Sequence, residues 1–291
     1  MKKIIRRFYK ILSLWCWDKN PVKATEYHYK GSMEKKPNLN KPKNLNEKIM
    51  WLKHNTYWEN SLVEKCADKY DSREYVMECG YSHILNEVFA VYKTSQEIDW
   101  SSLPKKFVIK TTNASKTNIF CTDKEKLDIP KTEKLLDSWL KIKYGRKSAE
   151  FHYKNDDPRI MFEKFLGKEN GELPADYKFY CFNGEPLYAG VISERETGAM
   201  TMSIVDLDFV EMPFLTDKYG RAKNLNKPET FGEMIEISKK LSSNFPFVRI
   251  DLYDIDGEII FGEMTFVPGA GVMKYFTEEA LLKLGALVEI D

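Results

Sequence analysis

The sequence has almost no excess of charge of either sign. Its 291 residues include 45 Lys and Arg against 44 Asp and Glu, which gives a formal net charge of +1. A protein that binds nucleic acid through its overall charge needs a basic excess. We therefore expect no nucleic-acid partner, and any electrostatic specificity has to be local.

Cysteine and histidine are also scarce. The five cysteines form no C-x-x-C motif and no regular framework, and no two of the four histidines have the spacing of metal ligands. These residues are Cys16, Cys66, Cys79, Cys121, Cys181, His28, His54, His83 and His152. A zinc site and a disulfide scaffold are not favoured, and a reduced, cytoplasmic location is the simplest expectation.

No apolar run is long enough to span a bilayer. The first 17 residues nevertheless predict a basic amphipathic helix, and no small-residue cleavage site follows them. Its apolar face holds Ile4, Ile5, Phe8, Ile11, Leu12 and Trp15, while Lys2, Lys3, Arg6, Arg7 and Lys10 lie largely elsewhere. Two interpretations stay open: the helix makes a peripheral contact with anionic lipid at the inner face of the membrane, or it packs on the protein's own body.

Residues 18–44 are rich in Lys, Asn and Pro and show no periodicity, so they predict a linker or an extended arm. A helix is expected from Asn46, as its cap, through Leu52. A second helix is expected over 61–80 and ends near Gly80.

Three basic residues recur at helical spacing within 61–80. Lys65, Lys69 and Arg73 stand at i, i+4 and i+8, so a continuous helix would place them on one side. A solvated basic face is the ordinary interpretation, and a platform for an anionic acceptor is the alternative.

A short apolar strand, 107–110, ends in Lys110 and runs into the polar stretch 111–118, which includes Ser115. A cation in this position suits the phosphates of a nucleotide. A further apolar strand is expected over 160–166.

The next pattern alternates over 176–182 and places Asp176, Lys178 and Tyr180 on one face. Asn183-Gly184 then predicts a hairpin turn. The returning strand is expected over 187–193. An ordinary cross-strand ion pair is the alternative to a functional role for this face.

The most informative stretch is 245–271. Its first strand places Arg249 and Asp251 on one face, the turn at 254–257 closes a hairpin, and the second strand returns Glu263 beside Asp251 with Thr265 two residues further on. Two converging carboxylates suit Mg²⁺ with substrate phosphates. The alternative is a structural hairpin whose acids pair with Arg249 and with lysines. The loop Pro268–Gly271 favours a ligand, because its backbone amides can approach one closely.

These motifs resemble a known family. Arg249-x-Asp251, Glu263-x-Thr265 and Pro268-Gly269 resemble the metal-binding end of ATP-grasp enzymes, whose usual pattern is Arg-x-Asp, Glu-x-Asn and Pro-Gly. Segments 247–253 and 261–266 are similar to the TupA-like ATP-grasp group of bacterial surface-polysaccharide clusters. The resemblance covers about residue 45 to the C-terminus, and Thr265 departs from the usual Asn.

The resemblance implies an α+β ATP-grasp fold, in which two α+β lobes clasp a nucleotide, with an N-terminal helical extension. We divide the chain accordingly into a basic helix and arm (1–44), a helical acceptor subdomain (45–104), a lid lobe (105–160) and a catalytic lobe (161–291).

The resemblance also implies ATP and Mg²⁺ as cofactors. Lys110 would contact phosphate, with Ser115 in a mobile lid, while Asp176 and Lys178 would line the nucleotide cleft. The adenine would meet Glu163 and the main chain of Lys164, Phe165 and Leu166. The predicted metal ligands are Asp251, Glu263 and Thr265, and the predicted catalytic residues are Arg249 and Lys178.

The implied function is an ATP-dependent carboxylate–amine ligase that forms an acyl phosphate. Its expected partners are an anionic sugar of a bacterial surface polysaccharide or its precursor and an amine or amino acid. The main alternative is a glycosyltransferase of capsule or lipopolysaccharide synthesis that uses a sugar nucleotide, since Asp206-x-Asp208 and Asp254-x-Asp256 match a metal-binding pair. A non-catalytic binding module and a kinase are the remaining hypotheses.

Overall fold

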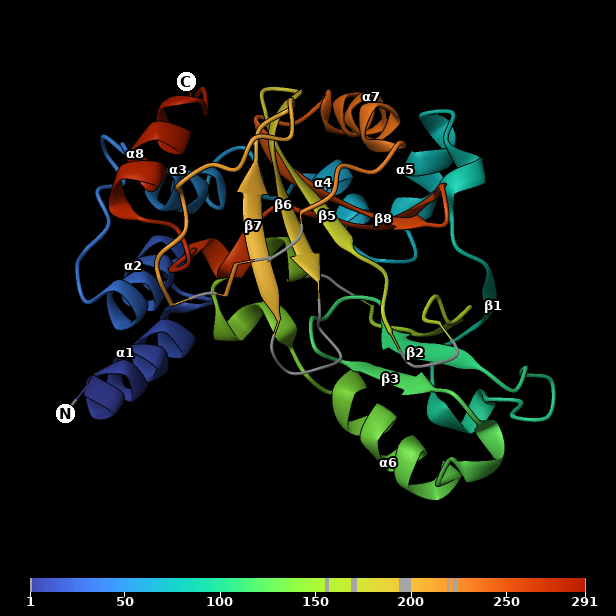
Figure 1. The fold of residues 1–291 in the computed structure, drawn as a ribbon. Helices are drawn as coiled ribbons and strands as arrows, with labels where there is room; N and C mark the ends of the chain where they lie inside the picture. The colour runs from blue at the N-terminus through green and yellow to red at the C-terminus, as the bar shows by residue number, and fades with distance from the viewer. Residues whose placement is uncertain are drawn as a thin grey trace.

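A computed structural model describes residues 2–154, 157–168, 172–193, 200–218, 220–221 and 225–290. Two antiparallel sheets and the helices around them form an α+β fold. The larger sheet lies between helices at one end of the molecule, and the smaller sheet forms a separate lobe below it (Figure 1).

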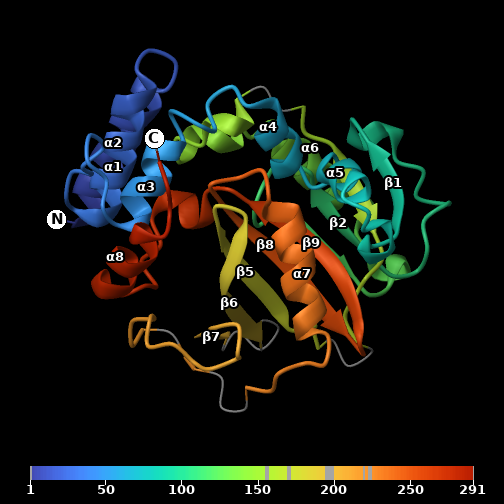
Figure 2. The same cartoon turned by 90° about the horizontal axis from the view of Figure 1, so that it is seen from above.

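The larger sheet has five strands in the order β7-β6-β5-β8-β9. Its strands are β5 (Asp176–Phe182), β6 (Glu185–Ser193), β7 (Thr201–Val205), β8 (Phe247–Ile255) and β9 (Glu258–Thr265). Both predicted hairpin turns are confirmed, because Asn183-Gly184 and Asp256-Gly257 have positive φ at both positions. Helix α7 (Phe231–Ser242) lies across one face of this sheet (Figure 2).

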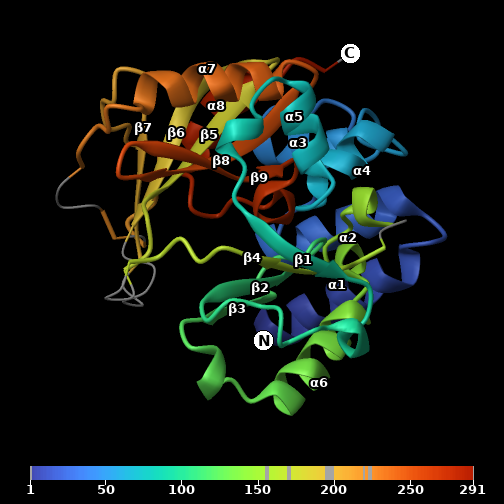
Figure 3. The same cartoon turned by 90° about the vertical axis from the view of Figure 1, so that its right-hand side faces the viewer.

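The smaller sheet has four strands in the order β1-β4-β2-β3. These are β1 (Val88–Tyr92), β2 (Phe107–Thr111), β3 (Asn118–Cys121) and β4 (Ile160–Glu163). Helix α6 (Ile129–Leu140) covers its outer face (Figure 3). Since β1 and most of β4 lie outside 105–160, the sheet extends beyond the range expected for the lid lobe. The division into domains stays a prediction.

Each lobe has its own core. Phe107 and Phe162 anchor the core of the small lobe, whereas the large core joins the five-stranded sheet to helices on both sides. The remaining elements are α3 (Leu45–Leu52), α4 (Ser61–Ala67), α5 (Ser72–Glu78), α8 (Glu278–Ala286), η1 (Ser82–Ile84), η2 (Ser95–Glu97), η3 (Lys124–Lys126), η4 (Tyr144–Lys147), η5 (Phe151–Tyr153) and η6 (Pro268–Gly271).

The chain begins with a pair of packed helices, α1 (Lys2–Cys16) and α2 (Pro21–Met33). The prediction of a linker or extended arm over 18–44 is therefore wrong for α2. This helix has a cap in Asn20, whose Oδ1 accepts from Lys23 N at 3.0 Å, and a proline in its first turn. Its packing against α1 supplies the stability that its weak periodicity does not indicate.

Helix α1 packs on the protein's own body through one face. Ser13 Oγ donates to Ala24 O at 2.8 Å, and the Trp17 ring stacks on Phe151 at 4.4 Å between centroids. Most of the apolar side chains predicted to share one face are exposed on another side. Packing on the body is thus confirmed, and contact with lipid stays a prediction. Among the described residues, no helix has the length and apolar character needed to cross a membrane.

The helices before the small lobe differ from two expectations. Asn44, and not Asn46, caps α3: its Oδ1 accepts from Glu47 N at 3.0 Å, while the buried Asn46 accepts from Met273 N. The single helix expected over 61–80 is interrupted at Asp68, whose Oδ1 accepts from the main-chain N–H groups of residues 70 and 71. Such local bonds compete with helical ones.

This interruption also removes the basic face expected from Lys65, Lys69 and Arg73. Lys65 pairs with two glutamates of α5, Arg73 donates to the Asn86 carbonyl at 2.9 Å, and Lys69 lies in the connection between the helices. The three side chains do not form one surface.

Candidate active site

The β8–β9 hairpin has the predicted register. Asp251 lies opposite Glu263, and Arg249 lies opposite Thr265. A bulge follows Asp251, and Gly262 occupies it. A Cβ at Gly262 would lie 2.9 Å from the Asp251 carbonyl oxygen, so glycine permits the close approach of the two strands.

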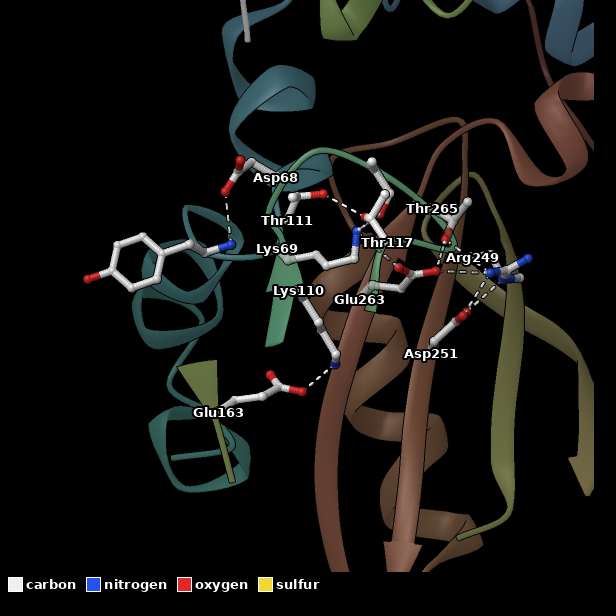
Figure 4. Close-up of polar contacts among 12 residues, drawn as sticks. Asp68, Lys69, Lys110, Thr111, Thr117, Glu163, Arg249, Asp251, Glu263 and Thr265 are labelled. Atoms are coloured by element: carbon white, nitrogen blue, oxygen red, sulfur yellow. Dashed lines mark hydrogen bonds and ion pairs between the residues drawn. The ribbon is translucent and has the colours of Figure 1, made fainter. Parts of the chain in front are cut away.

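Three side-chain oxygens converge on one nitrogen in this hairpin (Figure 4). Nη2 of Arg249 lies 2.7 Å from Asp251 Oδ2, 3.0 Å from Thr265 Oγ1 and 3.4 Å from Glu263 Oε1. The guanidinium therefore marks a position where a cation meets oxygens from three residues. Hard oxygen ligands of this kind suit Mg²⁺.

The number of carboxylates sets a limit on that site. Among the described residues, no group of three or more His, Cys, Asp or Glu side chains is arranged to hold a metal by itself. A cation here would have two carboxylates and one hydroxyl from the protein. This set fits Mg²⁺, which commonly takes one or two carboxylates and completes its shell with water and substrate phosphates.

Lys178 lies between two aspartates of the same sheet. Its Nζ is 2.7 Å from Asp176 Oδ2, and it also forms an ion pair with Asp251. Burial alone would lower the pKa of Lys178, but these two carboxylates raise it above the usual value. Lys178 is thus a fixed cation beside the hairpin, as its predicted role requires.

Glu263 faces a second lysine, Lys69, which was not expected in the site from the sequence. Lys69 Nζ lies 3.9 Å from Glu263 Oε2 and donates to the Ala114 carbonyl at 2.7 Å. Although burial favours the neutral acid, Lys69, Arg249 and Lys178 lower the pKa of Glu263 to about 2. The carboxylate is ionised at neutral pH. Lys69 reaches this position because α4 ends before it, at Ala67. The sequence indicated Lys69 only as part of the expected basic helix face.

A cavity lies between the two sheets, next to this cluster. Lys110 and Glu163 form an ion pair in its wall, and Lys164, Phe165 and Leu166 form one side. Apolar walls come from Val108, Phe120, Leu173, Pro174 and Tyr253. The sequence did not indicate that these apolar residues belong to the site, because they converge from distant parts of the chain.

The segment 164–166, which follows β4 and is called the hinge below, forms hydrogen bonds with the segment before β1. Lys164 N donates to Glu87 O at 2.9 Å, and its carbonyl accepts from Asn86 Nδ2 at 3.0 Å. These bonds hold the hinge against the cavity. Contact between the hinge and an adenine edge stays a prediction.

The loop between β2 and β3 closes on itself. The hydroxyls of Thr111 and Thr117 are 2.6 Å apart, and Thr111 N donates to Thr117 O at 3.2 Å. Ser115 is exposed at the turn of this loop and does not line the described cavity. Its proposed contact with a nucleotide therefore depends on a different arrangement of the loop.

The two Asp-x-Asp pairs serve local structure. Asp206 Oδ1 accepts from the main-chain N–H groups of Asp208 and Val210, at 3.1 and 2.8 Å. Asp254 accepts from the Thr230 hydroxyl and from Gly257 N. These contacts account for both pairs as turn residues.

Comparison with known proteins identifies one family. The family described as TupA-like ATPgrasp matches residues 47–289. No curated protein matches the sequence.

Several solved structures of ligases are similar to this chain over part of their length. D-alanine–D-alanine ligase from Bacillus anthracis, complexed with ATP, is 16% identical over 76% of this chain and 60% of that chain, with a TM-score of 0.44. The enzyme from Helicobacter pylori is 16% identical over 77% of this chain and 59% of that chain (TM-score 0.44). L-amino acid ligase from Bacillus licheniformis is 15% identical over 97% and 62%, with a TM-score of 0.48. The chain spans about 60% of the length of these ligases.

Proposed function

Because the chain belongs to the TupA-like ATP-grasp family, we propose that it is an ATP-dependent carboxylate–amine ligase. The observation that carries this proposal is the convergence of Asp251, Glu263 and Thr265 on one cation position beside the Lys110 cavity. ATP with Mg²⁺ is typical of the family, and the donor set fits that ion.

Each part of the site has a role in this proposal. The apolar walls of the cavity receive the adenine, and Lys110 and Lys178 neutralise the triphosphate. Asp251, Glu263 and Thr265 would hold Mg²⁺, which neutralises phosphate charge when bound. Arg249 shares these oxygens in the structure, so it has to leave them when the site fills. Its guanidinium can then stabilise charge on the transferring phosphoryl group.

The reaction has two steps. A carboxylate oxygen of the acceptor attacks the γ-phosphorus, and the bond to ADP breaks, which gives an acyl phosphate and ADP. An amine then attacks the acyl carbon, phosphate leaves with the shared oxygen, and the amine loses a proton to give the amide. The positive charges of Lys178 and Arg249 serve the first step, where negative charge moves onto the ADP oxygens.

For the acceptor we propose a sugar acid of a bacterial surface polysaccharide or its precursor, with an amino acid or small amine as nucleophile. The support is the resemblance to the TupA-like group. The basic face expected from Lys65, Lys69 and Arg73 is not formed, so it does not support the proposal of an anionic acceptor. All five cysteines are free thiols and the reaction consumes ATP, which supports a cytoplasmic location.

Incubation with ATP, Mg²⁺, a panel of uronic acids and hydroxylamine tests the function. Hydroxylamine intercepts an acyl phosphate, so a hydroxamate is expected with one ADP per product. Consumption of a nucleotide sugar without ADP or hydroxamate would instead support the glycosyltransferase. The turn roles of both Asp-x-Asp pairs argue against that alternative.

A further inference from the structure

Helix α1 has a fixed orientation on the protein. Its Tyr9 ring stacks on Tyr27 at 6.1 Å between centroids, and Ser13, Cys16 and Trp17 are buried. These contacts prevent the helix from turning about its axis. The opposite side of α1 therefore points away from the protein, at the edge of the molecule (Figure 1).

The outward side of α1 carries an apolar stripe. Ile4, Phe8, Ile11 and Trp15 follow at spacings of four, three and four residues, so they form one row along the helix. Their exposed fractions are 74%, 56%, 57% and 65%. A contiguous row of large exposed apolar side chains marks an interaction site.

A basic hollow of about 550 Å³ flanks this stripe, between α1, α2 and η4. Five cations line it, and none of the residues that line it is acidic. The five are Lys3, Arg6, Arg7, Lys10 and Lys147. The last of them comes from η4, distant in the sequence, so the fold extends the positive surface beyond the helix itself. Such a cluster attracts phosphate groups.

We propose that the stripe and the basic hollow together dock the protein on a bilayer of anionic phospholipids. The stripe enters the boundary between headgroups and acyl chains, and the five cations meet the headgroup phosphates. A second copy fits this surface poorly, because its identical cations would face these across a symmetric interface. A soluble polyanion could fill the hollow but would leave the stripe in water. The bilayer satisfies both features.

Vesicle flotation of the full chain tests this surface. One set of vesicles holds phosphatidylcholine alone, and the other also holds phosphatidylglycerol. Binding is expected only with phosphatidylglycerol, and it should weaken as salt rises. The Phe8→Ser/Trp15→Ser variant should lose most of the binding, and Lys147→Gln should weaken it about fivefold. Deletion of residues 1–17 is a poorer test, because it also removes Trp17, which packs on Phe151, and so changes the protein's own packing.

Two matched controls lie elsewhere on the surface. Leu282→Ser changes a leucine of α8 that is 52% exposed, and Lys239→Gln changes a lysine of α7 whose side chain is 51% exposed. Both should bind as the parent does. Equal binding to the two vesicle types, or unchanged binding by Lys147→Gln, would overturn the proposal. The proposal would also be overturned if the parent protein binds no vesicles but forms a dimer, and if Phe8→Ser/Trp15→Ser dissociates that dimer. The apolar stripe would then be the interface with a second copy.

Discussion

Asp251 and Glu263 are direct partners across the β8–β9 hairpin, and the guanidinium of Arg249 lies between their carboxylates. Replacement of either acid by its amide, Asp251→Asn or Glu263→Gln, should lower Mg²⁺-dependent ATP turnover by ~10²-fold. The physical reason is the loss of a charged oxygen ligand for the phosphate-bridging metal. The control is Glu258→Gln, which changes an exposed glutamate of β9, the strand that holds Glu263. Normal turnover by both amide variants would show that the hairpin binds no metal.

Lys110 should set the affinity for ATP. Lys110→Met keeps the apolar stem and removes the charge, so ATP should bind ~10- to 100-fold more weakly, the value of one or two charged hydrogen bonds. Thermal unfolding with and without ATP measures this, because a ligand that binds only the folded state stabilises it by RT ln(1 + L/Kd), where L is the free ligand concentration.

Two variants separate binding from stability at this position. Lys105→Met removes an exposed lysine that precedes the same strand, and it should respond to ATP as the parent does. Lys110→Met leaves the Glu163 carboxylate without its partner, and the double variant Lys110→Met/Glu163→Gln removes that carboxylate as well. A full stabilisation of Lys110→Met by ATP would restrict Lys110 to a structural role.

The charge on Glu263 should stabilise the fold in a definite pH range. Its pKa is lowered from 4.5 to about 2 in the folded state, so the ionised carboxylate contributes stability above pH 4.5. That contribution is lost as the pH falls from 4.5 towards 2. The difference in melting temperature between the parent and Glu263→Gln should therefore be largest near pH 6 and should shrink below pH 4.5. A difference that is constant from pH 6 to pH 3 would contradict the assignment of the lowered pKa.

Gly262 should be required for the geometry of the hairpin. In Gly262→Ala, the new Cβ meets the Asp251 carbonyl oxygen at 2.9 Å, so β9 has to move away from β8. We expect a loss of ~1–3 kcal/mol in the free energy of unfolding, together with weaker Mg²⁺-ATP binding. Gly232→Ala is the matched control, since nothing lies within 4 Å of that Cβ and alanine favours the helix. Equal stability of the two variants in urea titrations would show that the strands have room to adjust.

The sequence predicted the hairpin because its determinants are local. Alternation fixed the face that Asp251 shares with Arg249, and the Asp256-Gly257 turn fixed the register that brings Glu263 opposite. The same is true of the Asn183-Gly184 turn. Alternation and turn residues predict the register of a hairpin without knowledge of the rest of the fold, provided that one face of the sheet is buried.

What the sequence could not show depends on distant contacts. Helix α2 owes its stability to α1, and the apolar walls of the cavity come from both sheets. Periodicity predicts Lys69 on the face of a continuous helix. That prediction is wrong because Asp68 ends the helix through hydrogen bonds of its side chain, which periodicity does not reveal. Its contact with Glu263 joins residues that are far apart in the chain.

The most direct test of the proposed ligase follows one oxygen atom. An acceptor acid labelled with ¹⁸O in its carboxylate is incubated with ATP, Mg²⁺ and an amine, and the inorganic phosphate is analysed by mass spectrometry. An acyl phosphate transfers one carboxylate oxygen to phosphate, so each amide formed should release one phosphate that carries one ¹⁸O. Phosphate without label, with the amide formed at the normal rate, would contradict the acyl phosphate and with it the proposed mechanism.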